Sequence, residues 1–197
     1  ALRTVFGGRP AAKRDNPAEG ATADAVSTAA ERRLSARLMR VNHAGEIAAQ
    51  ALYHGQAMTA RRGDVRETMM QAAQEENDHL AWCQDRLKEL GGGTSLLDPA
   101  WYAGSLAIGA LAGAAGDGWS LGFLAETERQ VVAHLDDHLH RLPAGDHRSR
   151  AILRQMRDDE LRHATTAVNA GARPLPAPVK ALMSLTSKVM TWTAYRI

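Results

Sequence analysis

Two pairs of residues that commonly bind metal ions recur in the chain at helical spacing. Glu76 and His79 stand three positions apart in "EENDH", and Glu160 and His163 do the same in "DELRH". A lone glutamate precedes each pair by nearly the same distance, 30 positions in one case and 32 in the other. The set comprises Glu46, Glu76, His79, Glu128, Glu160 and His163. The repeated spacing predicts a site assembled from the same unit twice.

The chemistry of this set points to bound cations. Four carboxylates in an apolar interior would raise one another's pKa and favour protonation or unfolding, unless positive charge neutralises them. Two divalent metal ions would supply that charge, and each histidine would add one nitrogen ligand. Glu at i and His at i+3 share one helix face, so one helix can offer both groups to one ion. Bundles that hold two iron or two manganese ions have this pattern. The alternative is a polar core network in which the groups satisfy one another.

The elements that must carry these residues are helices. Strong helix formers fill long windows, aromatic residues make up only 5% of the chain, and runs of β-branched residues are absent. Start and stop signals predict helices over residues 27–60, 65–90, 118–142 and 147–170. Each has an apolar stripe at helical spacing. The prediction is an all-α fold, a four-helix bundle made of two short-looped pairs.

Helix geometry places the six residues at one depth of this bundle. Two antiparallel helices joined by a tight turn bring residues level when they are equidistant from the turn. The midpoint between Glu46 and His79 falls in the turn "RRGD", and the midpoint between Glu128 and Glu160 falls in "PAGD". Each lone glutamate therefore faces the Glu-x-x-His pair of its own hairpin, roughly 24 Å from the turn and in the middle of the bundle.

Two apolar segments lie outside the four predicted helices. Residues 99–116 are uncharged and are predicted to form a crossover helix, because proline and glycine make them a poor membrane span. Residues 178–197 predict an amphipathic helix with basic side chains available to lipid headgroups. Together with a basic, flexible N-terminal arm over residues 1–26, they favour a peripheral membrane protein that draws in a lipophilic substrate. A fully soluble protein is the alternative.

Composition narrows the function classes further. The net charge is +2, from 24 basic and 22 acidic residues without a basic block, so we expect no nucleic-acid partner. The lone Cys83 cannot form an intrachain disulfide and is expected to pack in the core. No signal-peptide pattern is present at the start, which predicts an intracellular protein.

Other polar residues have weaker predictions. His134 and His138 are expected on a solvated face, with a role behind the metal ligands as the alternative. His43 and Tyr53, close to Glu46 on the first helix, either support the site or simply pack. Two acidic residues near the ligands are predicted to point away from the metal: Glu75 and Glu126.

Four segments of the chain resemble a known family. "RVNHAGEIAAQALYHGQ", "EENDHL", "AETERQVVAHLDDH" and "DDELRHA", in this order, are similar to the ferritin-like di-iron demethoxyubiquinone hydroxylases of ubiquinone biosynthesis. "RVNHAGE" is the most discriminating of these segments. The resemblance implies a ferritin-like bundle in which the six residues named above hold two iron ions. It also implies a peripheral membrane enzyme, which we expect on the cytoplasmic face of the cell membrane.

The implied activity is a monooxygenase reaction on the ring of demethoxyubiquinone or its quinol, with O2 and a two-electron reductant. The implied partners are the lipophilic quinone, O2, a membrane surface, and either further copies of the chain or other ubiquinone-biosynthesis proteins. Leu135 stands where family members carry tyrosine, so an electron-relay tyrosine at that position is unsupported. The alternatives are a rubrerythrin-like peroxidase, an iron-storage protein and a non-catalytic lipid-binding bundle with structural metals.

Overall fold

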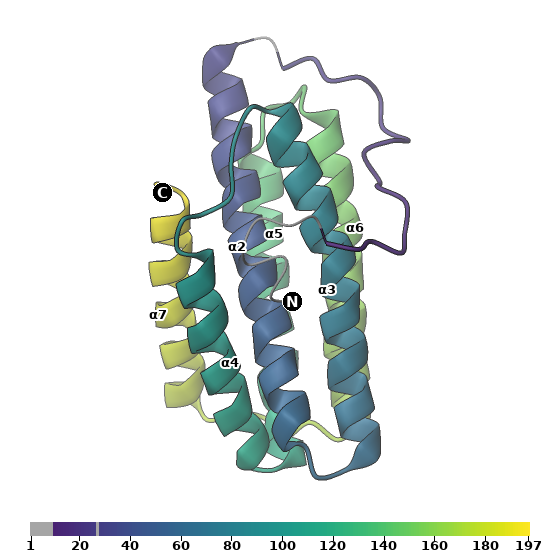
Figure 1. The fold of residues 1–197 in the computed structure, drawn as a ribbon, viewed down its shortest axis with the longest axis vertical. Coiled ribbons are helices and arrows are strands. Elements are labelled where there is room, and N and C mark those ends of the chain that lie inside the picture. Colours follow the sequence, from purple (N-terminus) through teal and green to yellow (C-terminus); the bar gives the residue numbers. More distant parts are fainter. Residues whose placement is uncertain (1–9, 27) are drawn as a thin grey trace.

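The computed structural model describes residues 10–26 and 28–197, and these residues form six helices joined by loops (Figure 1). The helices are α2 (Ala29–Thr59), α3 (Gly63–Glu89), α4 (Asp98–Ala114), α5 (Asp117–Arg141), α6 (His147–Asn169) and α7 (Ala177–Ala194). The predicted all-α class is confirmed. The four bundle helices begin and end within two residues of their predicted limits.

Local sequence signals set several helix ends. At the start of α2, the Glu31 backbone N–H donates to the Thr28 hydroxyl at 3.1 Å, and the Thr28 backbone N–H donates to the Glu31 carboxylate at 3.0 Å. Asp146 caps α6 through its side chain. α3 and α6 end close to glycines with positive φ, Gly91 at 71° and Gly171 at 102°. These signals fix the lengths of the helices that carry the metal-binding candidates.

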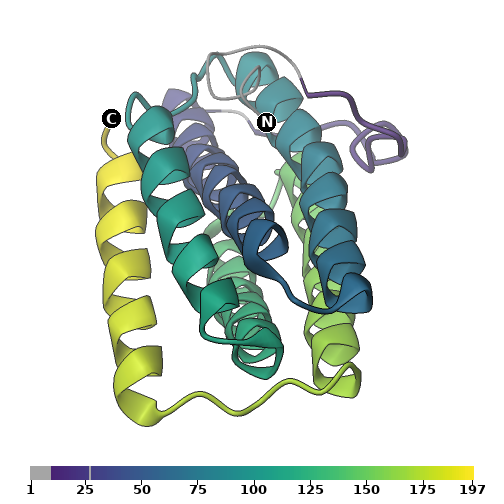
Figure 2. The same cartoon turned by 60° about the horizontal axis from the view of Figure 1, so that its bottom comes forward.

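The four long helices α2, α3, α5 and α6 make the bundle, and α4 and α7 lie together on one flank. In Figure 1, α2 and α6 run downward while α3 and α5 run upward, so that the facing pairs are antiparallel. Figure 2 shows α7 connected to α6 by a long loop along the bottom of the molecule. α4 packs along α2, and α7 contacts α2 and α5. The predicted crossover and C-terminal segments thus both form helices outside the bundle.

Glycines let α4 approach α2 at backbone distance. A Cβ added at Gly109 would overlap the carbonyl oxygen of Leu52, and one added at Gly55 would overlap that of Leu106. The opposite side of α4 stays exposed, as Leu111 shows at 72% exposure. None of the described helices is long and apolar enough to cross a bilayer.

Two apolar clusters pack above and below the polar centre of the bundle. One cluster, nearer the start of α2, includes Leu38, Trp82, Leu135 and Ile152. The other, nearer its end, includes Tyr53, Met69, Leu121 and Leu124. The predicted metal-binding residues occupy the layer between them, because along each helix they fall between members of the two clusters.

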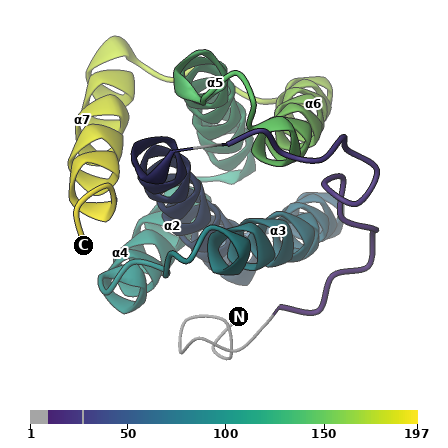
Figure 3. The same cartoon turned by 90° about the horizontal axis from the view of Figure 1, so that it is seen from above.

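The predicted flexible arm, residues 1–26, is described from residue 10 onward, and its first nine residues lie outside the described part. Residues 10–26 pass over α3 and α6 before the chain enters α2 (Figure 3). Arg14 pairs with Asp78 of α3 and Asp159 of α6, and Asp24 pairs with Arg86 of α3 at 2.6 Å. Backbone contacts add to these ion pairs, since the Ala25 N–H donates to the Gly145 carbonyl at 2.9 Å and the Arg148 N–H donates to Asp24 at 3.0 Å. The described part of the arm is therefore attached to the bundle near both of its ends. Its flexibility stays a prediction.

Candidate metal centre

The structure brings all six predicted residues into one buried cluster made of two overlapping groups. In each group, the candidate ligand atoms lie within 4.8 Å of one another. Glu76 and Glu160 belong to both groups. The first group is Glu46, Glu76, His79 and Glu160, and the second is Glu76, Glu128, Glu160 and His163. Two ions at this cluster would share the two common carboxylates.

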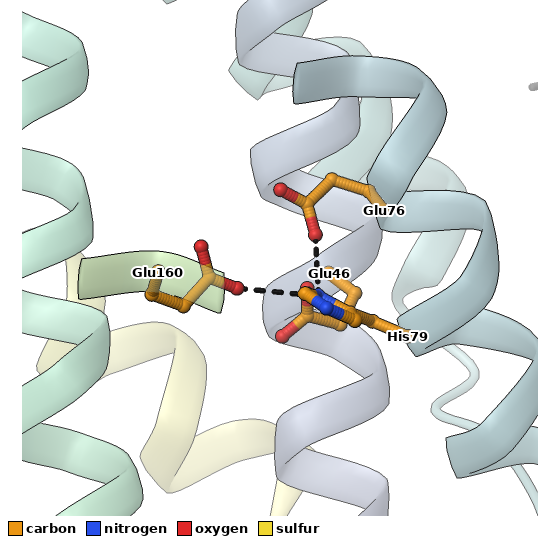
Figure 4. A group of neighbouring side chains, drawn as sticks. All are labelled: Glu46, Glu76, His79 and Glu160. Carbon is orange, nitrogen blue, oxygen red and sulfur yellow. Dashed lines mark hydrogen bonds and ion pairs between the residues drawn. The ribbon is translucent and has the colours of Figure 1, made fainter. Parts of the chain in front are cut away.

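His79 lies at the middle of the first group (Figure 4). Its Nδ1 atom is 2.9 Å from the Glu76 carboxylate, 3.2 Å from that of Glu160 and 3.3 Å from that of Glu46. The three carboxylates come from α3, α6 and α2, so the group forms only when these helices pack together. One nitrogen and three carboxylates thus converge on one point.

His163 repeats the arrangement in the second group. Its Nδ1 atom is 3.1 Å from the Glu160 carboxylate, 3.4 Å from that of Glu128 and 3.9 Å from that of Glu76. The lone glutamate here comes from α5, as Glu46 in the first group comes from α2. The sequence repeat is therefore also a repeat in space.

The outer nitrogen of each histidine meets an acid that precedes the other Glu-x-x-His pair. His79 Nε2 is 3.0 Å from Asp159, and His163 Nε2 is 2.9 Å from Glu75. Because a carboxylate only accepts, each Nε2 carries a proton, and a metal ion at either group would take the place of the proton that Nδ1 shares with the central carboxylates. Glu75 stays off the metal groups, as predicted, but sequence reasoning missed the positioning roles of Glu75 and Asp159. The available signal was the acidic residue directly before each Glu-x-x-His pair.

Burial and mutual repulsion shift the pKa values of the central carboxyls. Burial, followed by the charges of Glu160 and Glu46, holds the pKa of Glu76 well above its usual range. Burial and the charge of Glu160 raise the pKa of Glu128 to about 8. Burial also opposes ionisation of Glu160, but hydrogen bonds from His163 and His79 outweigh it and lower the pKa of that carboxyl. Additional positive charge beside Glu76 and Glu128 would favour their ionised forms.

The donor set fits two divalent metal ions. Glu76 Oε1 and Glu128 Oε2 are buried and have no hydrogen-bond partner among the described residues. Buried carboxylate oxygens without donors are costly, and a cation relieves that cost directly. Each group offers one imidazole nitrogen and three carboxylates, ligands that suit iron, manganese or zinc. That these residues bind metal stays a prediction, now with a geometry that suits it.

Tyr53 supports the second group. Its buried hydroxyl donates to Glu128 Oε1 at 2.5 Å, which leaves Oε2 as the oxygen without a partner. Burial and the charge of Glu128 hold the pKa of the Tyr53 phenol well above its usual value, so the phenol keeps its proton. The sequence left two roles open for Tyr53, support of the site or packing alone. The hydrogen bond to Glu128 shows that Tyr53 lies at the site.

The prediction of a solvated face for His138 is wrong. Its ring is only 2% exposed, and His138 Nδ1 lies 2.9 Å from the Asn42 side-chain oxygen. The His134 ring packs against it with the centroids 3.9 Å apart. The spacing of residues along α5 could not reveal this burial, because it depends on packing against another helix, and Asn42 belongs to α2.

The remaining candidates lie away from the two groups. His43 pairs with Asp98 at 3.3 Å and so ties α2 to the start of α4. Glu126 lies outside the metal groups, as predicted, and pairs with Lys180 of α7 at 3.4 Å. Cys83 is buried in the core, with Sγ 3.8 Å from the Met156 sulfur, so its predicted packing role is confirmed.

A cavity of about 300 Å³ reaches the metal groups from the flank covered by α4 and α7. Its wall is mainly apolar and includes Glu46 at the centre of the bundle, with Trp101, Leu135 and Met183 among its apolar members. A more open groove of about 670 Å³ lies between α2, α3 and α4, but none of the six metal-binding candidates lines it. Of these two, the 300 Å³ cavity is the one that connects an apolar flank with the candidate centre.

The helical fold and the buried cluster of carboxylates and histidines are typical of ferritin-like bundles, a class that includes proteins with two metal ions. Comparison with known families then identifies the group within the class. The family described as "Ubiquinone biosynthesis protein COQ7" matches residues 33–194, and the chain belongs to this family.

Relatives and a solved structure agree with this placement. The 3-demethoxyubiquinol 3-hydroxylase of Nitrosococcus oceani is 61% identical over 197 residues, which cover 100% of this chain and 92% of the relative. The enzyme of the same name from Xanthomonas euvesicatoria is 59% identical, with 100% and 90% covered. A dodecameric thioferritin from Bacteroides fragilis has a TM-score of 0.58 at 19% identity, and covers 68% of this chain and 82% of that one. This last similarity supports the ferritin-like fold.

Proposed function

We propose that the protein is a di-iron monooxygenase that hydroxylates the ring of demethoxyubiquinol in ubiquinone biosynthesis. Its family and the names of its relatives support this activity. The observation that carries the proposal is the apolar cavity, because Glu46 is part of its wall and a lipophilic ring inside it lies next to the metal groups. In the balanced reaction, one oxygen atom of O2 enters a ring C–H bond. The other leaves as water, with two electrons and two protons from a reductant.

The six residues of the two groups hold the metal ions in this proposal: Glu46, Glu76, His79, Glu128, Glu160 and His163. Two bound iron ions would supply the electrons and the Lewis acidity that O2 activation needs. Glu75 and Asp159 keep the outer imidazole nitrogens protonated, and Tyr53 restrains Glu128 through one oxygen. These contacts hold the ligand atoms in place before a metal ion binds.

Polar atoms on the cavity wall can orient the quinol. His134 Nε2 and Thr127 Oγ1 are buried without a hydrogen-bond partner in the described part of the chain, and both residues line the cavity. A quinol ring carries hydroxyl and methoxy oxygens that can satisfy such groups. The apolar wall excludes water from the ring and suits an isoprenoid chain. This arrangement binds the ring by its oxygens and the tail by burial.

Exposed apolar side chains surround the outer side of this cavity. On α7, Leu182 is 64% and Trp192 60% exposed, and Leu185 and Val189 of the same helix are exposed as well. Leu111 of α4 adds to this surface, and Lys188 of α7 and Arg196, just after its end, provide positive charge. An amphipathic helix with this pattern lies in a membrane interface. The protein in this proposal therefore binds a membrane peripherally and takes the quinol from it.

Turnover by purified protein tests the activity. Iron-loaded protein is given demethoxyubiquinol, O2 and a chemical reductant, and the product is identified by mass spectrometry. Wild type is expected to form the hydroxylated ring, and Glu128→Ala is expected to form none. Asp137→Ala, on an exposed position of the same helix, is the control that keeps activity. Equal turnover by wild type and Glu128→Ala would contradict the proposal. Quinol binding without O2 consumption would favour the lipid-binding bundle.

Vesicle binding tests the membrane surface. The double variant Leu185→Ser/Trp192→Ser is expected to sediment less with anionic lipid vesicles than wild type does. Leu161→Ser is the control, because Leu161 is an exposed apolar residue on α6, outside this surface. Equal sedimentation of all three proteins would remove the membrane-binding role of α7.

A further inference from the structure

Arg14 reaches the metal centre from the N-terminal arm, outside the region that matches the family. Its Nε atom donates to Asp78 at 2.7 Å, and its Nη1 atom donates to Asp159 at 2.8 Å. The guanidinium carbon lies 4.8 Å from the centroid of the Trp82 ring. The Lys13 backbone N–H also donates to Asp78, at 2.6 Å, which fixes the arm beside α3. Arg14 is thus held in place by an acid on α3, an acid on α6 and a buried aromatic ring.

One oxygen atom links Arg14 to a metal-binding candidate. Asp159 Oδ2 accepts from Arg14 Nη1 at 2.8 Å and lies 3.0 Å from His79 Nε2. The guanidinium has donors only, and the carboxylate has acceptors only, so the proton between Asp159 and His79 belongs to the imidazole. Arg14 therefore helps to hold the carboxylate that keeps His79 Nδ1 directed at the first metal group. The hydrogen-bonded route from the arm to the ligand thus runs through Asp159, and Arg14 Nη2 itself lies 3.4 Å from His79 Nε2.

The second metal group has a weaker support at the equivalent point. Glu75, the acid beside His163 Nε2, has a side chain 25% exposed, whereas the side chain of Asp159 is fully buried. Glu75 is held by Arg162 at 3.4 Å and Gln71 at 3.2 Å, and no residue of the described arm contacts it. The arm thus distinguishes two metal positions that the sequence repeat alone makes alike.

We propose that Arg14 is a positioning residue that raises the metal affinity of the His79 position above that of the His163 position. The inference rests on the dinuclear centre proposed above, and adds a function for a segment outside the matched family region. Arginine suits this role better than lysine, because its planar fork donates to Asp78 and Asp159 simultaneously while its face packs on Trp82.

Cobalt titration of the full chain tests the proposal without any turnover assay. Co²⁺ is added to chelator-treated protein, and the visible absorption of bound Co²⁺ reports the affinity and ligand field of each position. Wild type is expected to bind two ions, one more tightly than the other. Arg14→Gln is expected to weaken the tighter site by about tenfold, the lower end of the range for groups that orient metal ligands. Asp24→Asn is the control, since it removes the charge of another ion pair of the arm, with Arg86, without touching Asp159.

Combination with ligand variants assigns the effect to one position. In a His163→Gln background, which retains the His79 position, Arg14→Gln is expected to weaken the remaining site by about tenfold. In a His79→Gln background it is expected to leave the remaining site unchanged. If Arg14→Gln does not fold, Arg14→Lys replaces it in the same titration. We expect an intermediate loss of metal affinity, because lysine keeps the positive charge but cannot donate to two carboxylates with a planar fork.

The outcomes separate this inference from the proposed function. If wild type binds two Co²⁺ ions and Arg14→Gln binds both as wild type does, Arg14 has no positioning role and the metal centre stands. Equal weakening of both positions by Arg14→Gln and by Asp24→Asn would show that the arm acts only through general stability. If wild type binds no Co²⁺, the dinuclear centre itself fails.

Discussion

The two halves of the candidate metal centre are built from the same sequence unit, but they are not equally supported. In the His79 half, the supporting carboxylate of Asp159 is fully buried and contacts Arg14, Gln155 and Arg162 in addition to His79. In the His163 half, the supporting Glu75 is partly exposed and its contact with Arg162 is longer. Burial strengthens hydrogen bonds to a charged group, so we expect the His79 half to be the more rigid and tighter metal position.

In this chain an internal repeat sets which residues can bind metal, but it does not make the two metal positions equivalent. Both halves have one histidine, one lone glutamate and two shared glutamates. The difference between the halves has two causes outside the repeat. Of the two supporting acids, the described part of the arm contacts only the one that supports His79, and that acid is more deeply buried than the acid that supports His163. A metal centre with unequal positions can be filled in order, which is a property that no single unit of the repeat encodes.

The largest expected effect comes from a carboxylate that both halves share. Glu160→Ala should reduce bound metal from two equivalents to near zero, whereas Glu46→Ala should remove mainly the His79 position and Glu128→Ala mainly the His163 position. Activity of Glu160→Ala should fall by about 10³-fold or more, because a metal ion contributes several kcal/mol of stabilisation. Metal analysis of each purified variant measures this. If Glu160→Ala still bound two equivalents of metal, the two halves would not share the Glu160 carboxylate.

Neutralising the two supporting acids tests the inequality directly. Asp159→Asn should weaken metal binding at the His79 position by roughly 10- to 100-fold, because it removes the buried negative charge that fixes the imidazole and leaves one acceptor oxygen in place of two. Glu75→Gln should weaken the His163 position by a smaller factor, since solvent already competes at that partly exposed carboxylate. Competition titrations against a chelator give both values. A larger effect from Glu75→Gln would reverse the comparison.

Tyr53 contacts only the second group and offers a smaller test. Tyr53→Phe removes one hydrogen bond to Glu128 while it keeps the ring packed, and we expect a loss of up to about tenfold in affinity at the His163 position. The His79 position should be unaffected. Spectra of Co²⁺-loaded protein distinguish the two positions, and a change confined to the His79 bands would contradict the expected contact.

His138 provides a contrast to both halves, because it is buried without a carboxylate partner among the described residues. Burial, followed by the charges of His134 and Arg141, lowers the pKa of His138 to about 2. An unfolded chain takes up this proton as the pH falls below about 6.5, but the folded chain does not. His138 should therefore lower the free energy of unfolding by up to about 1.4 kcal/mol for each unit by which the pH is reduced below about 6.5.

Urea unfolding between pH 6.5 and 5 measures this slope. His138→Gln should flatten it, and His140→Gln, an exposed position on the same helix, should leave it unchanged. An identical slope in all three proteins would show that His138 takes up its proton in the folded state. The metal-centre histidines differ because carboxylates outweigh their burial and raise the pKa of each ring.

Much of the fold was predictable because its signals are local. Helical periodicity, the capping pair at Thr28 and Glu31, and the glycines after α3 and α6 set the helices and their ends. The convergence of the six metal-binding candidates at one depth followed from helix rise and loop length alone, since both are properties of the backbone.

The support of the site was not predictable, because it depends on contacts between segments that are distant in the sequence. Asp159 serves the histidine of α3 rather than that of its own helix, and His138 is buried by elements beyond its own. Arg14 reaches the centre across 145 positions to Asp159. Residue types and helical spacing thus determined which groups could bind metal. The packing of helices and the path of the arm decided which of those groups are held, oriented and shielded from water, because hydrogen bonds and burial depend on distances in space.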